Sequence, residues 1–145
     1  MNYLLGIDLG TSGTKTVLFD ETGLGIASAT IEYPLYQPKN GWAEQDPQSW
    51  WDAVVKGLQV ILKKAKVDPA DIVGLSYSGQ MHGLVVLDAD DNIIRPAILW
   101  NDGRTAKQGD YLNNGIGKEK LSQLTANIAF AGFTAPKILW MKENE

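Results

Sequence analysis

The chain has 145 residues, of which 44% are hydrophobic and 21% are charged, as in a globular domain and unlike a disordered or fibrous protein. Its net charge of −4 comes without a basic cluster, which argues against nucleic acid or an anionic membrane as a partner. It has 0 Cys, which excludes disulfides and thiol chemistry. No basic leader and no apolar run near the roughly 20 residues of a membrane span are present, so a cytoplasmic protein is expected.

The first part of the chain has the pattern of three short strands. Apolar runs at residues 4–7 and 14–19 are separated by the turn-forming sequence GTSG, and a tight turn at residues 20–23 leads to an alternating run at 25–33. Strands joined so closely must be antiparallel, because a parallel return needs a connection of a dozen or more residues. These residues therefore predict a three-stranded antiparallel meander.

A long amphipathic helix is expected next. After a loop at residues 34–45, Asp46 and Pro47 have the form of an N-cap followed by a proline in the first turn. Apolar residues at helical spacing predict a helix from about residue 47 to 66, with Trp51 in the core. Aromatic packing at the start of this helix is the favoured interpretation of Trp42, with a pocket wall as the alternative. Residues 72–77 then predict a buried strand.

The second half of the chain predicts shorter elements. A glycine-bounded loop at residues 78–83 precedes strands at 84–87 and 93–100, which a turn at 88–92 connects. Helices are expected at residues 104–112, ended by Asn-Asn-Gly at 113–115, at 118–124, and from 134 onward. The last helix has no stop signal, so a truncated part of a longer protein is expected. The overall prediction is an α/β fold with an open mixed sheet and helices on both faces, its strand order switching after the meander.

The sequence GIDLGTSGTK at residues 6–15 carries the first candidate site. A carboxylate at the end of a strand, beside a glycine-rich turn, can hold a metal ion while the N–H groups of the turn face an anion. Thr14 stands where a P-loop needs glycine, and the turn opens no helix, so neither a P-loop nor a dinucleotide fingerprint is present. An ordinary hairpin turn is the alternative. The candidate residues are Asp8 for the metal and Gly10, Thr11, Ser12, Gly13 and Lys15 for the phosphates.

Two further loops carry polar residues suited to a small hydroxylated ligand. His82, the only histidine, lies beside Met81 in a loop between glycines, where a histidine bonded to a backbone carbonyl is the alternative interpretation. Trp100, Asn101 and Asp102 follow a predicted strand and combine an apolar wall with hydrogen-bonding groups. For these residues the alternative is structural, with Trp100 in the core and Asp102 as a helix N-cap.

Several of these segments resemble known sequences. GIDLGTS at residues 6–12 resembles the first phosphate motif of the actin-like, ribonuclease H-like ATPase fold. EQDP at 44–47, GQMHG at 79–83, LWNDGR at 99–104 and GFTAPKILW at 132–140 are similar to segments of the FGGY carbohydrate kinases, and within them of the xylulokinases. The resemblance covers nearly the whole chain in the same order. It identifies residues 1–145 as an incomplete N-terminal kinase domain whose second domain is absent.

The resemblance implies ATP- and Mg²⁺-dependent phosphorylation of D-xylulose to D-xylulose 5-phosphate. It implies that Asp8 acts near the metal and phosphate end, and that Met81, His82, Trp100, Asn101 and Asp102 contact the sugar. Asp8, His82 and Asp102 are expected to converge at one sheet edge. The implied partners are the sugar, ATP and the missing C-terminal half, with a homodimer of the longer protein left open.

The same resemblance sets limits on the chain. Family members are several times longer and carry their general base beyond residue 145, so this chain alone is expected to lack kinase activity. One alternative is an FGGY kinase for another ketose, a polyol or a sugar acid. A second is a non-kinase actin-like nucleotide-binding protein, such as a filament protein or a chaperone ATPase, and a third is a structural module without ligands.

Overall fold

The computed structural model describes all residues from 1 to 145 and divides into two compact units. The first unit consists of Met1–Pro34 and Pro47–Gln80, and the second of Leu35–Asp46 and Met81–Glu145. None of the helices is both long enough and apolar enough to cross a membrane.

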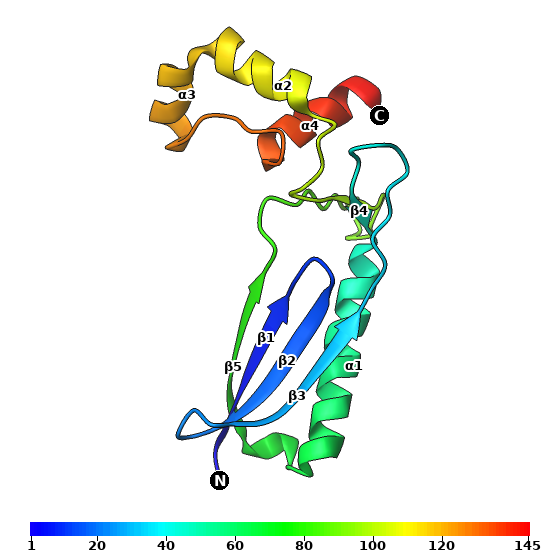
Figure 1. Ribbon diagram of the computed structural model, residues 1–145, viewed down its shortest axis with the longest axis vertical. Helices are drawn as coiled ribbons and strands as arrows, with labels where there is room; N and C mark the ends of the chain where they lie inside the picture. Colours follow the sequence, from blue (N-terminus) through cyan, green and yellow to red (C-terminus); the bar gives the residue numbers. More distant parts are fainter. The chain divides into compact units, whose positions relative to one another are not determined.

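The first unit is built on a 4-stranded sheet in the order β3-β2-β1-β5 (Figure 1). The strands β1 (Tyr3–Leu9), β2 (Gly13–Asp20) and β3 (Gly25–Glu32) form an antiparallel meander. β5 (Ile72–Gly79) pairs with β1 in parallel, after the chain has passed through the helix. The predicted meander, the mixed sheet and the switch in strand order are thus confirmed.

One helix, α1 (Pro47–Ala65), packs on this sheet, and a 3₁₀ turn, η1 (Pro69–Asp71), follows it. The buried residues of α1 are Ala53, Gly57 and Ile61, which recur every four residues and so lie along one face. No other α-helix belongs to this unit, so within it the sheet carries a helix on one face only. The hydrophobic core between helix and sheet contains Leu5, Ile7, Leu18, Ala27 and Ile61.

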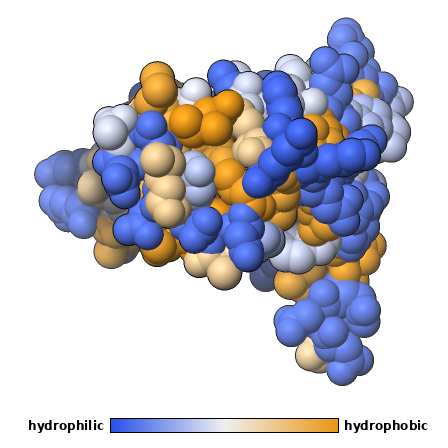
Figure 2. Space-filling view, turned by 90° about the horizontal axis from the view of Figure 1, so that it is seen from below, coloured by the Kyte–Doolittle hydropathy of each residue, from blue (hydrophilic) through white to orange (hydrophobic).

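Two predictions about burial in this unit are wrong. Trp51 is 64% exposed, because α1 turns its small residues toward the sheet and Trp51 lies on another side of the helix. β5 is not a buried strand, since Tyr77 is 82% exposed at this edge of the sheet. Hydrophobic residues also reach the surface among polar ones in the space-filling view (Figure 2).

The second unit contains little sheet. β4 (Glu44–Gln45) pairs with β6 (Ala97–Ile98), and single bridges join Leu84 to Ile98 and Leu87 to Ile93. The strand predicted at residues 93–100 is thus present only as the short β6, and the one predicted at 84–87 is reduced to the single bridges at Leu84 and Leu87. The predicted turn between them is present, and there the Asp88 side chain accepts hydrogen bonds from backbone N–H groups.

Helices make up the rest of the second unit. They are α2 (Ala106–Tyr111), a π-helical segment η2 (Leu112–Gly117), α3 (Lys118–Thr125) and α4 (Thr134–Asn144). The Asn-Asn-Gly sequence at 113–115 does not end the helix as predicted, because the chain continues through η2 to Gly117. Gly117 has a φ of 94°, a value that suits glycine, and this residue makes the change of direction into α3.

Candidate functional site

Asp8 lies near the end of β1 with its carboxylate exposed on the sheet. The Ser78 hydroxyl on β5 donates a hydrogen bond of 2.7 Å to Asp8 Oδ1. Lys15 on β2 is the direct cross-strand partner of Asp8 in the antiparallel register. Residues paired in this way project to the same face of a sheet, so a carboxylate, an ammonium and a hydroxyl from three adjacent strands share one face.

The turn between β1 and β2 is fixed by bonds to its backbone. Gly10 N–H donates to Gly13 C=O at 3.1 Å, which closes the turn. Gln80 N–H donates to Leu9 C=O at 2.9 Å, and Thr11 Oγ1 donates to Gln80 Oε1 at 3.4 Å. The chain after β5 therefore holds the predicted phosphate turn from the side. Ser12, within the turn, is exposed.

A tyrosine supports the same turn. The Tyr33 hydroxyl donates to Gly10 C=O, and burial raises the pKa of this phenol, with the nearby negative charge of Asp8 adding to the rise. A side chain at Gly13 would clash, because its Cβ would lie 2.7 Å from Ile31 C=O. The glycine at this position thus lets β2 and β3 approach closely, and the turn is held in one shape.

The sheet face beside Asp8 carries a hollow of about 330 Å³. No group of three or more His, Cys, Asp or Glu side chains is placed to hold a metal ion. Mg²⁺ in phosphoryl-transfer sites keeps several waters and binds through one or two carboxylates plus the phosphates of the substrate. A single exposed carboxylate fits that kind of ion. Residues that line the hollow include Asp8, Lys15, Phe19, Ser76, Tyr77 and Ser78.

In the second unit, His82 has an unusual backbone. Its φ is 64°, in the left-handed region that residues with a Cβ rarely adopt. Its carbonyl accepts hydrogen bonds from Lys137 Nζ at 2.7 Å and from Thr134 Oγ1 at 3.3 Å. The imidazole stacks on Phe133, with ring centroids 4.3 Å apart and planes inclined by 17°. His82 and its neighbour Met81 remain exposed.

Lys137 is the largest fully buried side chain of the protein, with none of its surface exposed. Besides the His82 carbonyl, its ammonium donates to Gly132 C=O at 2.5 Å. Burial lowers the pKa of Lys137 to about 8, while the charge of Asp102 acts in the opposite direction and that of Arg104 adds to the lowering. Lys137 is not among the residues predicted for the site.

Asp102 is buried, and hydrogen bonds within the protein occupy its carboxylate. Oδ2 accepts from Ala43 N–H at 2.6 Å and from Arg104 Nη2 at 2.7 Å. Oδ1 accepts from the N–H and the Nε of Arg104, both at 2.9 Å. A carboxylate has about four acceptor positions, so the direct sugar contact expected of Asp102 has no free acceptor in this geometry. Thr105, not Asp102, occupies the N-cap of α2.

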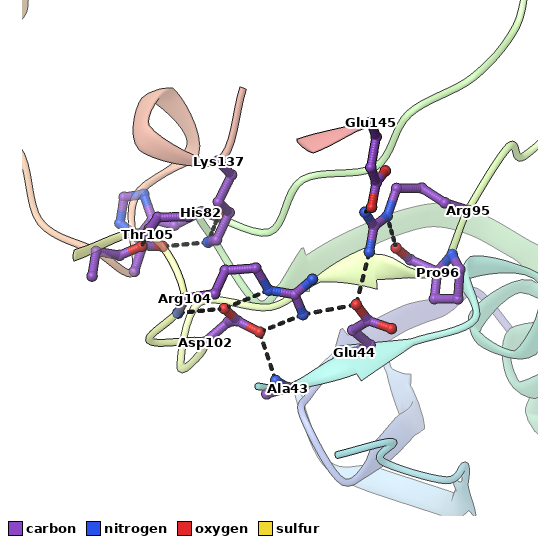
Figure 3. Close-up of polar contacts among 12 residues, drawn as sticks. Ala43, Glu44, His82, Arg95, Pro96, Asp102, Arg104, Thr105, Lys137 and Glu145 are labelled. Carbon is purple, nitrogen blue, oxygen red and sulfur yellow. Dashed lines mark hydrogen bonds and ion pairs between the residues drawn. The ribbon is translucent and has the colours of Figure 1, made fainter. Parts of the chain in front are cut away.

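The Arg104 guanidinium joins this carboxylate to aromatic rings. It lies 3.6 Å from the centroid of Trp42, whose ring meets Trp140 edge-on at 5.4 Å. Arg104 Nη2 also pairs with Glu44 Oε1 at 2.7 Å, and Glu44 in turn pairs with Arg95 at 2.7 Å (Figure 3). Within this unit Trp42 packs on Arg104 and Trp140, and the aromatic packing predicted for it at the start of α1 stays a prediction.

The remaining predicted sugar residues are accessible. Trp100 is 49% exposed, so the core position considered for it is excluded, and Asn101 is exposed beside it. Met81 is 72% exposed. Asp8 belongs to the first unit, whereas His82 and Asp102 belong to the second, so their convergence stays a prediction.

The structure adds residues that sequence reasoning missed. Ser78 and Tyr33 support Asp8 and its turn, and Lys137 and Arg104 support the two loops of the second unit. Local patterns give no sign of these roles, because Ser78 is 70 residues from Asp8 and Lys137 is 55 residues from His82 along the chain. A lysine within an otherwise apolar helical segment was the one available signal.

The fold and the arrangement of these loops place the chain among the sugar kinases of the actin-like ATPase fold. The crystal structure of a xyloylose kinase from Brucella ovis superposes on 99% of this chain with a TM-score of 0.92 and 39% identity, over 30% of its own length. The crystal structure of a gluconate kinase from Lactobacillus acidophilus covers 99% of this chain and 28% of its own, with a TM-score of 0.89 and 33% identity.

Sequence comparison agrees with the structural comparison. The xylulose kinase of Staphylococcus xylosus is 43% identical over 145 residues, covering 100% of this chain. The chain spans 30% of the length of that relative. The family model described as "FGGY family of carbohydrate kinases, N-terminal domain" matches residues 3–145. The chain belongs to the FGGY family of carbohydrate kinases and contributes residues of its N-terminal domain.

Proposed function

We propose that the protein carrying this chain transfers the γ-phosphoryl group of ATP to a hydroxyl of D-xylulose, giving D-xylulose 5-phosphate. The observation that carries the proposal is the position of Asp8, an exposed carboxylate held by Ser78 and opposed by Lys15, beside a turn with fixed backbone. Phosphoryl transfer needs positioning and charge stabilisation more than covalent help. Asp8 would hold a hydrated Mg²⁺, which would neutralise part of the phosphate charge when bound.

Each candidate site residue of the first unit has a role in this proposal. Asp8 would hold the metal, directly or through its waters, and the Ser78 hydroxyl fixes the Asp8 carboxylate by its bond to Oδ1. Lys15 offers a positive charge to the phosphates from the neighbouring strand. The turn residues Gly10, Thr11, Ser12 and Gly13 offer N–H and hydroxyl donors.

The second unit supplies the sugar residues. Met81, His82, Trp100 and Asn101 are accessible, and together they offer an apolar wall and hydrogen-bonding groups for a polyhydroxylated chain. Asp102 acts indirectly, by holding Arg104 and the backbone at Ala43. The choice of xylulose rests on the relative from Staphylococcus xylosus. The gluconate kinase structure is the observation that favours a sugar acid as the second candidate substrate.

The test is a coupled assay of ATP-dependent phosphorylation on the whole protein that carries this chain. The Asp8→Asn variant removes the charge but keeps the size of the side chain, and we expect kcat to fall roughly 100-fold or more. The matched control is Glu21→Gln, an exposed carboxylate in the turn between β2 and β3, which should leave kcat unchanged. An Asp8→Asn variant with the kcat of wild type would overturn the assigned role.

The substrate is tested in the same assay. D-xylulose, gluconate and glycerol are compared by kcat/KM with ATP held constant. We expect the highest kcat/KM for D-xylulose. A higher value for gluconate would support the kinase function but contradict D-xylulose as the substrate. The absence of phosphorylation with every sugar and polyol tried would contradict the kinase function itself.

A further inference from the structure

A buried ammonium that the proposed chemistry does not use needs an explanation. Lys137 lies in α4, with its whole surface removed from solvent. Burying a charge is unfavourable unless hydrogen bonds compensate it. The compensation comes from two backbone carbonyls, those of His82 and Gly132, and not from a carboxylate at hydrogen-bond distance. The Lys137 ammonium therefore fixes two backbone positions, those of His82 and Gly132.

The first of these positions is the strained one. A left-handed backbone at a residue with a Cβ, such as His82, persists only where its surroundings determine it. Its carbonyl receives two donors from α4, Lys137 Nζ and Thr134 Oγ1, and its ring lies on Phe133, the residue before that helix. The 133–137 segment thus holds both the backbone and the side chain of His82.

The second position connects to the other predicted sugar loop. Gly132 packs so closely on Trp100 that a Cβ at this glycine would lie 2.2 Å from the Trp100 carbonyl oxygen. One residue earlier, the Ala131 carbonyl accepts from Thr105 Oγ1 at 2.6 Å. The segment at Ala131 and Gly132, which Lys137 bonds through the Gly132 carbonyl, is therefore packed against the loop that carries Trp100 and Asn101.

We infer that Lys137 is a positioning residue, which sets the spacing between the Met81–His82 loop and the Trp100–Asn101 loop by bonding His82 C=O and Gly132 C=O at once. Three ammonium donors on a long stem can serve two carbonyls that come from distant parts of the chain. An apolar side chain of similar length, such as that of methionine, fills much of the same space but has no donor for either carbonyl. Figure 3 shows Lys137 beside His82.

The consequence for sugar binding rests on the proposed function. If both loops contact the sugar, loss of this bridge lets them move apart and weakens recognition, while ATP binding at the first unit is unaffected. A weaker sugar site raises the KM for sugar, whereas a general loss of folding lowers the amount of active enzyme without moving KM. The two loops form one site only when their spacing is kept.

The experiment compares Lys137→Met with Lys137→Arg in the whole protein that carries this chain. We expect Lys137→Met to raise the sugar KM roughly 10-fold or more, the effect of losing hydrogen bonds from a charged donor, with the KM for ATP unchanged. Lys137→Arg keeps the donors and should recover part of the loss. Thermal unfolding of each variant separates mispositioning from loss of fold.

A second readout does not depend on the sugar. The His82 ring protons lie over the Phe133 ring and should resonate upfield in the proton NMR spectrum, in a signal assigned by its loss in His82→Gln. In Lys137→Met this signal should move toward the position of an unstacked histidine. An unmoved signal in a folded variant would overturn the inference.

The two readouts keep this inference separate from the proposed function. If the signal moves but the sugar KM does not, the bridge has no role in recognition and the inference is overturned. If wild type phosphorylates no sugar while the signal still moves, the proposed function falls and the positioning of His82 by Lys137 stands.

Discussion

Gly57 is a buried residue of α1 that lies close to the sheet, and Gly57→Ala tests that contact. In an open helix position the change would stabilise the protein by about 1 kcal/mol, because alanine is the better helix former. Here the new Cβ would lie 2.8 Å from Thr16 Oγ1, on a side chain with no exposed surface. Overpacking a core costs about 1–3 kcal/mol, so we expect a net loss of up to about 2 kcal/mol.

A second substitution isolates the clash. Thr16→Ala removes the Oγ1 atom, after which the nearest remaining atom of residue 16 is its Cβ, at 3.5 Å, an ordinary contact. In that background Gly57→Ala should stabilise the protein by about 0.5–1 kcal/mol, so that the coupling between the two sites is about 1–3 kcal/mol. Oγ1 of Thr16 is buried without a hydrogen-bond partner, so its own removal should cost little.

Urea unfolding of the chain, followed by circular dichroism, measures the four free energies of this cycle. Gly109→Ala in α2 is the control. Its new Cβ would meet nothing closer than 3.8 Å, so this substitution should stabilise the protein. If Gly57→Ala is equally stabilising with and without Thr16 Oγ1, the close approach of helix and sheet is wrong, and the reasoning from packing is refuted.

Three further predictions concern the two units. Ile61→Ala, at a fully buried position under the sheet, should lower the free energy of unfolding by about 2–5 kcal/mol in the same urea assay, and a loss below 1 kcal/mol would contradict the core assignment. Gly132→Ala should displace Trp100, seen as a shift in tryptophan fluorescence, and an unchanged spectrum in a folded variant would contradict the contact. Because the pKa of Lys137 falls to about 8 from an ordinary 10.5, the unfolded chain binds more protons between these values, so this residue should make stability rise with pH across that range. Urea titrations at several pH values should show a rise that is smaller in Lys137→Met, and identical slopes in the two proteins would refute the shift.

The elements that local sequence determines could be predicted. The meander, α1 and the start of α4 depend on turn residues, on a proline in the first turn and on helical spacing, all of which act within a few residues. The turn at residues 10–13 also sets the register that places Lys15 opposite Asp8. That part of the candidate site follows from a hairpin with a short loop.

Properties that depend on distant partners could not be predicted. Trp51 has the spacing of a core residue, but small residues on another face of α1 decide which side meets the sheet. Lys137 acts on a carbonyl 55 residues away, and Arg104 closes onto Glu44 from a distant loop. Asp102 has the residue type of a ligand-binding group, yet four hydrogen bonds within the protein occupy its carboxylate.

The proposed activity also bears on the chain by itself. The chain spans 30% of the length of its relative from Staphylococcus xylosus. We expect the purified 145-residue chain to show no sugar-dependent release of ADP. Steady turnover of D-xylulose by this chain alone would contradict that expectation.

The most direct test of the central claim is a titration of intrinsic tryptophan fluorescence with D-xylulose, because Trp100 lies in a predicted sugar loop and is 49% exposed. The titration uses the whole protein that carries this chain, beside its His82→Ala variant. We predict a saturable change in wild type that His82→Ala abolishes. A response of equal affinity in both proteins would contradict the assignment of the His82 loop, and a wild type that responds to gluconate but not to D-xylulose would contradict the substrate.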